Sequence, residues 1–242
     1  MTDLHTHILP GMDDGSPSPE ISIAMLREEA SQGVDTVVLT PHYYRERENS
    51  AHFLERRDAA MEALRKAILA LPEEEQAALP KLRMGAEVAW VPNLMDCSHL
   101  RELCYEGTRA FLLELPMVPW YAGLFNQLYE LMNATGLIPV IAHIDRYWNS
   151  QKPERMRELT DLGLPTQLSA EMLLHFSTRG RAVKTLEKGG AQFLMSDCHG
   201  VNSRKPNLGP GMEVVRKKLG QQVHQRLAAQ SDSLLRDFAL QP

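Results

Sequence analysis

Short apolar runs alternate with longer amphipathic stretches along the whole chain. Several runs are almost continuously hydrophobic, among them residues 36–39, 111–113 and 140–142. Such runs are typical of strands buried on both faces of a parallel sheet. The pattern predicts seven strands, at residues 3–7, 36–42, 82–88, 110–115, 138–144, 166–169 and 192–197.

The stretches between these strands predict helices, because apolar residues recur at three- and four-residue spacing and most stretches end near Gly or Pro. The predicted helices cover residues 19–32, 51–71, 122–134, 153–162 and 181–188, with one or two more in 212–240. Residues 71–80 hold two prolines and three consecutive glutamates, which predicts a loosely held connection. Alternating strands and helices predict an α/β protein, either a parallel barrel or a doubly wound sheet.

Composition and charge exclude several classes of protein. A hydrophobic content of 43% over 242 residues is that of one ordinary globular domain. The net charge of −5 argues against a nucleic-acid partner. No signal peptide and no run of about 18 apolar residues is visible, and three cysteines form no disulfide framework. We therefore expect a cytoplasmic protein without membrane insertion, and leave oligomerisation open.

Candidate chemistry lies at the strand ends. Two histidines in His5-Thr6-His7 point to one face of a strand and can reach one metal ion. Six of the seven predicted strands carry His, Asp or Glu at or just past the carboxyl end, where α/β folds assemble their sites. The candidate ligands are His5, His7, Asp14, His42, Glu87, Glu114, His143, Asp197 and His199.

Simpler interpretations exist for single members of this set. Asp14 could be a turn or helix-cap residue, as we expect for Asp13. Glu87 and Glu114 could each form a separate buried ion pair. Taken together, the nine side chains are better explained by metal binding.

Nine ligands exceed the roughly four to six that one ion takes, so two or three divalent ions are expected, bridged by a carboxylate. Imidazole and carboxylate ligands without thiolate suit Mn, Fe or Zn. We favour Mn, with Fe, Zn or Mg as alternatives. Clustered ions lower the pKa of a bridging water and neutralise attacking and leaving oxygens, which indicates hydrolysis at phosphorus.

The motifs resemble those of the polymerase and histidinol phosphatase (PHP) superfamily. More narrowly, the similarity from residue 1 to about residue 215 is to the bacterial capsule-type (CpsB/CapC-like) tyrosine-protein phosphatases. It rests on the runs D-L-H-T-H-I-L-P-G-M-D-D-G, T-P-H-Y, G-A-E-V, L-E-L-P, A-H-x-x-R-Y and S-D-C-H-G. The resemblance implies a distorted TIM-like (β/α)7 barrel of PHP type with a trinuclear metal site. It would be one domain over residues 1–242, with C-terminal helices in 212–240 packed on the barrel.

The resemblance also implies a metal-dependent phosphatase that hydrolyses phosphotyrosine by attack of a metal-bridging hydroxide. Its substrate would be the tyrosine-rich tail of a bacterial autokinase that regulates capsule or exopolysaccharide biosynthesis. All nine ligand positions carry over. Arg146 and Arg204 are candidates for clamping phosphate, because a guanidinium meets two phosphate oxygens at once. Asp197 or His199 could donate a proton to the leaving group.

The chain departs from the usual family motifs at two places, and its residues are also compatible with other functions. Ile144-Asp145 and Cys198/Gly200 differ from the usual residues, which puts loop geometry in question. Residues 198–204 also spell C-x5-R, the spacing of cysteine-dependent phosphatases, but Pro206 and Pro210 disfavour the helix that such a loop opens. The rivals are a histidinol-phosphate type phosphatase, a nuclease or proofreading module, and a non-catalytic metal-binding regulator.

Overall fold

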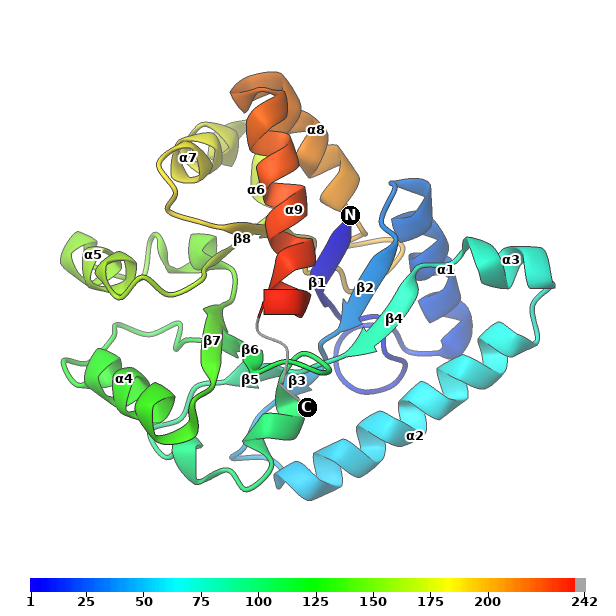
Figure 1. Cartoon of the computed structure of the whole chain (residues 1–242), viewed down its shortest axis with the longest axis horizontal. Helices are drawn as coiled ribbons and strands as arrows, with labels where there is room; N and C mark the ends of the chain where they lie inside the picture. The colour runs from blue at the N-terminus through cyan, green and yellow to red at the C-terminus, as the bar shows by residue number, and fades with distance from the viewer. Residues whose placement is uncertain (238–242) are drawn as a thin grey trace.

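The computed structural model describes residues 1–237. Parallel strands lie at its centre and helices surround them (Figure 1). The strands are β1 (Thr2–Thr6), β2 (Thr36–Leu39), β3 (His42–Tyr43), β4 (Lys81–Met84), β5 (Glu87–Ala89), β6 (Ala110–Glu114), β7 (Ile138–Ile141), β8 (Gln167–Ser169) and β9 (Phe193–Met195). The predicted α/β class with parallel sheets is confirmed.

Hydrogen-bonded ladders divide the strands into three sheets, in the orders β1-β2-β4, β3-β5-β6-β7 and β8-β9. Isolated parallel bridges join Thr6 to Cys198 and Ile141 to Thr166. Within residues 1–237 no continuous ladder closes these sheets into a barrel.

Two of the predicted strands are each broken in the middle. Residues 36–42 form β2 and β3, and residues 82–88 correspond to β4 and β5. Pro41 has no N–H to give to a ladder, which explains the first break. The second break, at Gly85-Ala86, lies beside the first. The backbone is closely packed there, because a Cβ on residue 85 would come within 3.2 Å of the side chains of Thr40 and Tyr105. After the breaks, β3 and β5 pair with His42 opposite Glu87.

The helices lie largely where the sequence predicts them. They are α1 (Pro19–Ser31), α2 (Ser50–Leu69), α3 (Glu73–Ala78), α4 (Leu124–Thr135), α5 (Pro153–Asp161), α6 (Glu171–Leu174), α7 (Phe176–Glu187), α8 (Leu208–Leu219) and α9 (Gln221–Asp237). Short 3-10 turns are η1 (Leu94–Asp96), η2 (Leu100–Leu103) and η3 (Ile144–Tyr147).

Three boundaries differ from the prediction. The 71–80 connection contains α3, whose first turn holds three glutamates that suit the positive end of a helix dipole. Helix α7 begins at Phe176 and runs through Gly180, because one interior glycine costs only about 1 kcal/mol. The tail forms two helices, within the predicted one or two, but the first begins at Leu208 and not at residue 212; Gly220, with φ +89°, separates them. Residues 238–240 of the predicted tail lie outside the described residues.

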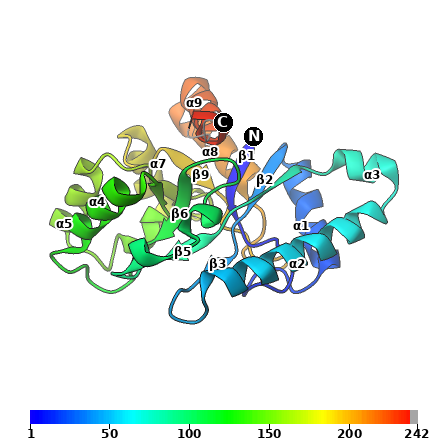
Figure 2. The ribbon, with the colours of Figure 1, turned by 60° about the horizontal axis from the view of Figure 1, so that its bottom comes forward.

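Helix α9 lies on the same side of the strands as the start of β1 (Figure 2). Its Leu234 and Leu235 join a buried cluster with strand residues that include Leu4 and Val38. Apolar side chains therefore fill the end of the strands beside α9. The candidate ligands lie at the opposite end of the strands. No helix within residues 1–237 has the length and hydrophobicity needed to span a membrane.

Candidate metal centre

His5 and His7 lie at an irregular part of β1 and directly after it. The register of β1 on β2 shifts between Asp3 and Thr6, which adds one residue to β1 in the manner of a bulge. The carboxylate of Asp3 accepts the N–H groups of His5 at 3.2 Å and of Ser196 at 3.2 Å. Both imidazoles are fully buried, and their Nε2 atoms lie 3.1 Å apart.

Asp13 has a larger role than the turn residue that the sequence predicts. It does make the turn, since its Oδ1 accepts the N–H of Gly15 at 2.9 Å. Its Oδ2 also lies 2.7 Å from Nδ1 of His7 and accepts the N–H of His42 at 2.8 Å. With Nδ1 donating to Asp13, the lone pair of His7 Nε2 faces the cluster. A Cβ at Gly15 would come within 2.2 Å of the His7 carbonyl oxygen, so only glycine fits there.

Glu87 lies at the centre of the site with 1% of its surface exposed. Its Oε2 is 3.2 Å from Nε2 of His5, 3.2 Å from Nε2 of His7 and 3.0 Å from Nδ1 of His42. Its Oε1 is 2.8 Å from Nε2 of His143. One carboxylate therefore touches four predicted ligands that come from three segments of the chain.

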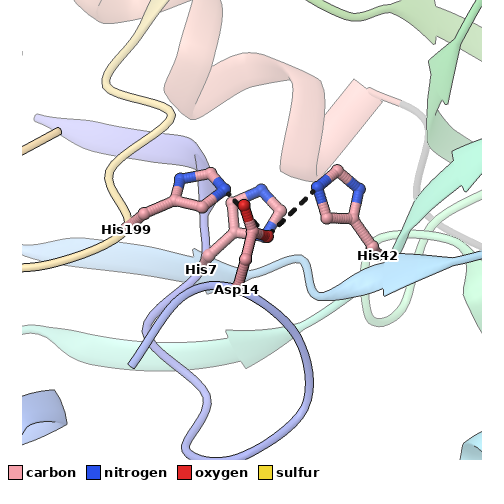
Figure 3. A group of neighbouring side chains, drawn as sticks. All are labelled: His7, Asp14, His42 and His199. Carbon is pink, nitrogen blue, oxygen red and sulfur yellow. Dashed lines mark ion pairs between the residues drawn. The ribbon is translucent and has the colours of Figure 1, made fainter. Parts of the chain in front are cut away.

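The remaining predicted ligands border this centre. Glu114 Oε1 lies 3.4 Å from His143 Nε2. Asp197 Oδ1 lies 3.3 Å from His5 Nε2. The ring of His199 stacks on that of His7, with centroids 3.8 Å apart. Figure 3 shows Asp14 between the rings of His199 and His42, at 3.5 and 3.6 Å from their Nε2 atoms.

The donors fit metal ions in number and chemistry. Three sets have ligand atoms within 4.8 Å of one another: His7, Asp14, His42 and His199; His5, His7 and Glu87; and His42, Glu87 and Glu114. Five buried atoms of the predicted ligands have no hydrogen-bond partner among the described residues: Oε2 of Glu87, Nδ1 of His42, Nδ1 of His143, Oδ1 of Asp197 and Nε2 of His199. Buried donors of this kind need a cation to offset their desolvation.

The carboxylates make the site strongly attractive to positive charge. Burial raises the pKa of Glu87, but the charge of His5, the hydrogen bond with His143 and the close ring of His42 hold it well below its usual value. Burial lowers the pKa of His7, yet Asp13 and Glu87 raise it to about 10. Glu87 is thus ionised, and the rings beside it bind either protons or metal ions.

Arg146 and Arg204 lie at the edge of the cluster. Both donate to Oδ2 of Asp197, Arg204 at 2.9 Å. Nη1 of Arg204 is also 3.6 Å from Oδ2 of Asp14. Their side chains are 33% and 34% exposed, so both guanidinium groups face the cluster and solvent at once.

Backbone strain is concentrated in this site. Within residues 1–237, the non-glycine residues with positive φ are His143, Asp197 and Arg204, at 28°, 54° and 45°. Such conformations cost about 1–3 kcal/mol each and typically cluster where function requires them. All three belong to the predicted site: His143 and Asp197 as predicted ligands, and Arg204 as a predicted phosphate clamp.

Comparison with known proteins identifies the family. A profile of the family described as "Capsular polysaccharide synthesis, CpsB/CapC" matches residues 1–236. The chain belongs to the CpsB/CapC family. This confirms the resemblance drawn from the sequence motifs.

Relatives in the CpsB/CapC family carry phosphatase names. The chain is 31% identical to the tyrosine-protein phosphatase CpsB of Streptococcus pneumoniae, over 91% of each chain. It is 29% identical to the tyrosine-protein phosphatase YwqE of Bacillus subtilis, over 98% of this chain and 92% of the relative. A solved structure described as YwqE and CpsB, "unique metal-dependent tyrosine phosphatases", matches with TM-score 0.84 and 25% identity. That match covers 100% of this chain and 96% of the other.

Cys198, which departs from the usual CpsB/CapC-like motif, faces away from the ligand cluster. It is fully buried, and its Sγ lies 3.6 Å from Oε1 of Glu29 on α1. Burial and the charge of Glu29 hold its pKa well above the usual value, so no thiolate forms. The prolines do not prevent a helix here, which corrects the expectation from the sequence: Pro210 lies inside the first turn of α8, where its missing N–H is tolerated.

Replacement of Cys198 by Ser is therefore expected to leave aryl-phosphatase activity within a few-fold of the wild type. A buried hydroxyl can still donate to Glu29, and a thiol outside the ligand cluster does no chemistry. The measurement is steady-state hydrolysis of an aryl phosphate with added Mn²⁺. Near-complete loss of turnover in a folded variant would restore the cysteine mechanism.

Proposed function

We propose that this chain is a metal-dependent protein-tyrosine phosphatase. The observation that carries the proposal is the overlap of the three donor sets. Each of Glu87, His7 and His42 belongs to two of these sets. Two guanidinium groups border these sets. Relatives named tyrosine-protein phosphatases, at up to 31% identity over most of the chain, support the choice of substrate class.

The three sheets would together form one distorted (β/α)7 barrel of PHP type, as a single domain. Two isolated bridges support this arrangement. Thr6–Cys198 connects the end of β1 to the residues after β9, and Ile141–Thr166 connects β7 to the residue before β8. Breaks at residues 40–41 and 85–86 account for the distortion. C-terminal helices α8 and α9 would be integral to the domain, since α9 packs on its apolar interior.

We propose two or three divalent ions, with Mn as the resident metal. The overlap of the donor sets at Glu87 supports more than one ion, because one carboxylate with two oxygens can bridge. When bound, such ions lower the pKa of a coordinated water and offset negative charge on the phosphate.

The chain's own groups would bind and orient the phosphate. Arg146 and Arg204 each place a planar guanidinium at the rim, suited to two phosphate oxygens. A cavity of about 440 Å³ opens beside Asp14 and His42 and is lined by Tyr44 and Arg47. The Arg47 guanidinium stacks on the Tyr44 ring at 4.2 Å. An aromatic leaving group could be bound there.

Proton donation by Asp197 or His199, an option from the sequence, is disfavoured by their surroundings. Burial and the charge of His7 lower the pKa of His199 to about 3, so its ring is neutral at pH 7. Burial raises the pKa of Asp197, but His5 and Arg146 lower it to about 2, so it stays ionised. Both groups suit ligation, and a tyrosyl oxygen with an ordinary pKa of about 10 leaves without a strong acid nearby.

The physiological substrate would be the phosphorylated tail of a bacterial tyrosine autokinase that controls capsule or exopolysaccharide biosynthesis. The family's link to capsular polysaccharide synthesis supports this assignment. The cytoplasmic location expected from the sequence stays a prediction.

Removal of metal tests the proposed function. Dialysis against a chelator is expected to abolish hydrolysis of a phosphotyrosine peptide, and Mn²⁺ is expected to restore it, since the ions supply several kcal/mol of charge stabilisation. Elemental analysis of the purified protein gives the number of ions. Histidinol phosphate serves as the competing substrate, and faster turnover of it would favour the small-molecule rival. Metal binding without any hydrolysis would indicate a regulatory protein.

A further inference from the structure

Gln167 lies in the one predicted strand, residues 166–169, that carries no candidate ligand. It begins β8, and its side chain is fully buried. Its Oε1 lies 2.9 Å from Nδ1 of His5 and 2.9 Å from the backbone N of His143. One amide oxygen therefore contacts a predicted ligand within β1 and the backbone of another that follows β7.

The backbone contact determines which atom of the amide faces the site. The N–H of His143 can only donate, so the atom that meets it must be the amide oxygen. The same oxygen faces Nδ1 of His5, and an oxygen acceptor requires that Nδ1 carry the proton. The lone pair of His5 then lies on Nε2, the atom that is 3.2 Å from Glu87 and 3.3 Å from Asp197.

The second contact restrains a strained residue. His143 has φ 28°, a conformation that needs support from its surroundings. Its Nε2 lies 2.8 Å from Oε1 of Glu87. The hydrogen bond from its N–H to Gln167 fixes the peptide from which this ring projects.

We propose that Gln167 is a positioning residue of the metal centre: it sets the tautomer of His5 and the backbone position of His143. The inference rests on the proposed metal-dependent function. An amide suits this role better than a carboxylate, because the site already holds Asp14, Glu87, Glu114 and Asp197 and a further negative charge would add to their repulsion.

Substitution of Gln167 by Leu tests the proposal through metal affinity. We expect about 10- to 100-fold weaker Mn²⁺ binding by isothermal titration, the usual effect of removing an outer partner of a ligating histidine. Gln167→Glu retains an oxygen for both donors and is expected to bind Mn²⁺ more tightly than Gln167→Leu. Gln192→Leu is the matched control, since that amide oxygen accepts the N–H of Thr166, the residue before Gln167, and contacts no predicted ligand. Unchanged Mn²⁺ affinity in a folded Gln167→Leu variant would overturn the proposal.

The wild-type protein gives an independent readout that does not depend on how the variants fold. Nitrogen NMR of the zinc-loaded protein, with histidines labelled, reports which ring nitrogen of His5 carries hydrogen. We expect hydrogen on Nδ1, and a metal-bound Nδ1 or a bare Nδ1 would contradict the role of Gln167. These measurements do not use turnover, so failure of the phosphatase assay and failure of this inference are separate results.

Discussion

Replacement of Glu87 by Gln is expected to reduce metal-dependent hydrolysis of a phosphotyrosine peptide by on the order of 10³-fold or more. The carboxylate belongs to two of the three donor sets and touches four histidines. The substitution removes the buried negative charge that lies beside those four rings and that would help to hold the ions. Several kcal/mol of charge stabilisation is at stake, and each 1.36 kcal/mol corresponds to tenfold in rate.

The matched control is Glu29→Gln. Glu29 is also a fully buried glutamate, but it lies on α1 beside Cys198 and outside the donor sets. Burial and the charge of Asp3 hold its pKa well above the usual value, which favours the neutral carboxyl, and an amide resembles that form. We expect activity and bound metal to be retained in this variant. Equal losses in both variants would show that buried glutamates act here only through stability.

Lysine in place of Arg146 or Arg204 is expected to lower kcat/KM for phosphotyrosine peptide by about 10²–10³, the effect of losing a donor aimed at developing charge. A lysine keeps the positive charge but cannot meet two phosphate oxygens in one plane. Arg181→Lys is the control, because that guanidinium stacks on Trp148 at 4.5 Å and contacts no predicted ligand.

Measurement of bound metal in these variants distinguishes two causes of lower activity, namely weaker phosphate binding and loss of metal. Each arginine also bonds Asp197, so removing one leaves the other to neutralise that carboxylate. Bound metal is therefore expected to stay at the wild-type level while kcat/KM falls. A parallel fall in both would assign the arginines to holding Asp197, and wild-type kcat/KM would exclude them as phosphate clamps.

Local pattern was enough to predict the class of the fold and the composition of the site. Apolar runs of strand length predict buried parallel strands, and a polar residue at the end of such a run predicts a site at the sheet edge. This pattern predicts His5, His7, Glu87 and Asp197, and both histidines lie within 4 Å of both carboxylates. Each of these patterns spans only a few consecutive residues, so it can be recognised without knowing how distant segments pair.

Only the tertiary structure determines which donor sets each side chain belongs to and which neighbours orient it. The bulge in β1, the facing breaks in the broken strands and the rotation of Cys198 toward Glu29 depend on contacts between distant segments. Gln167 and Asp13 have their roles because one is brought to His5 across 162 positions and the other folds back on His7. Sequence supplies the ligand types, since each strand end is a local signal. Register and backbone strain supply the geometry, since they are properties of the assembled sheets.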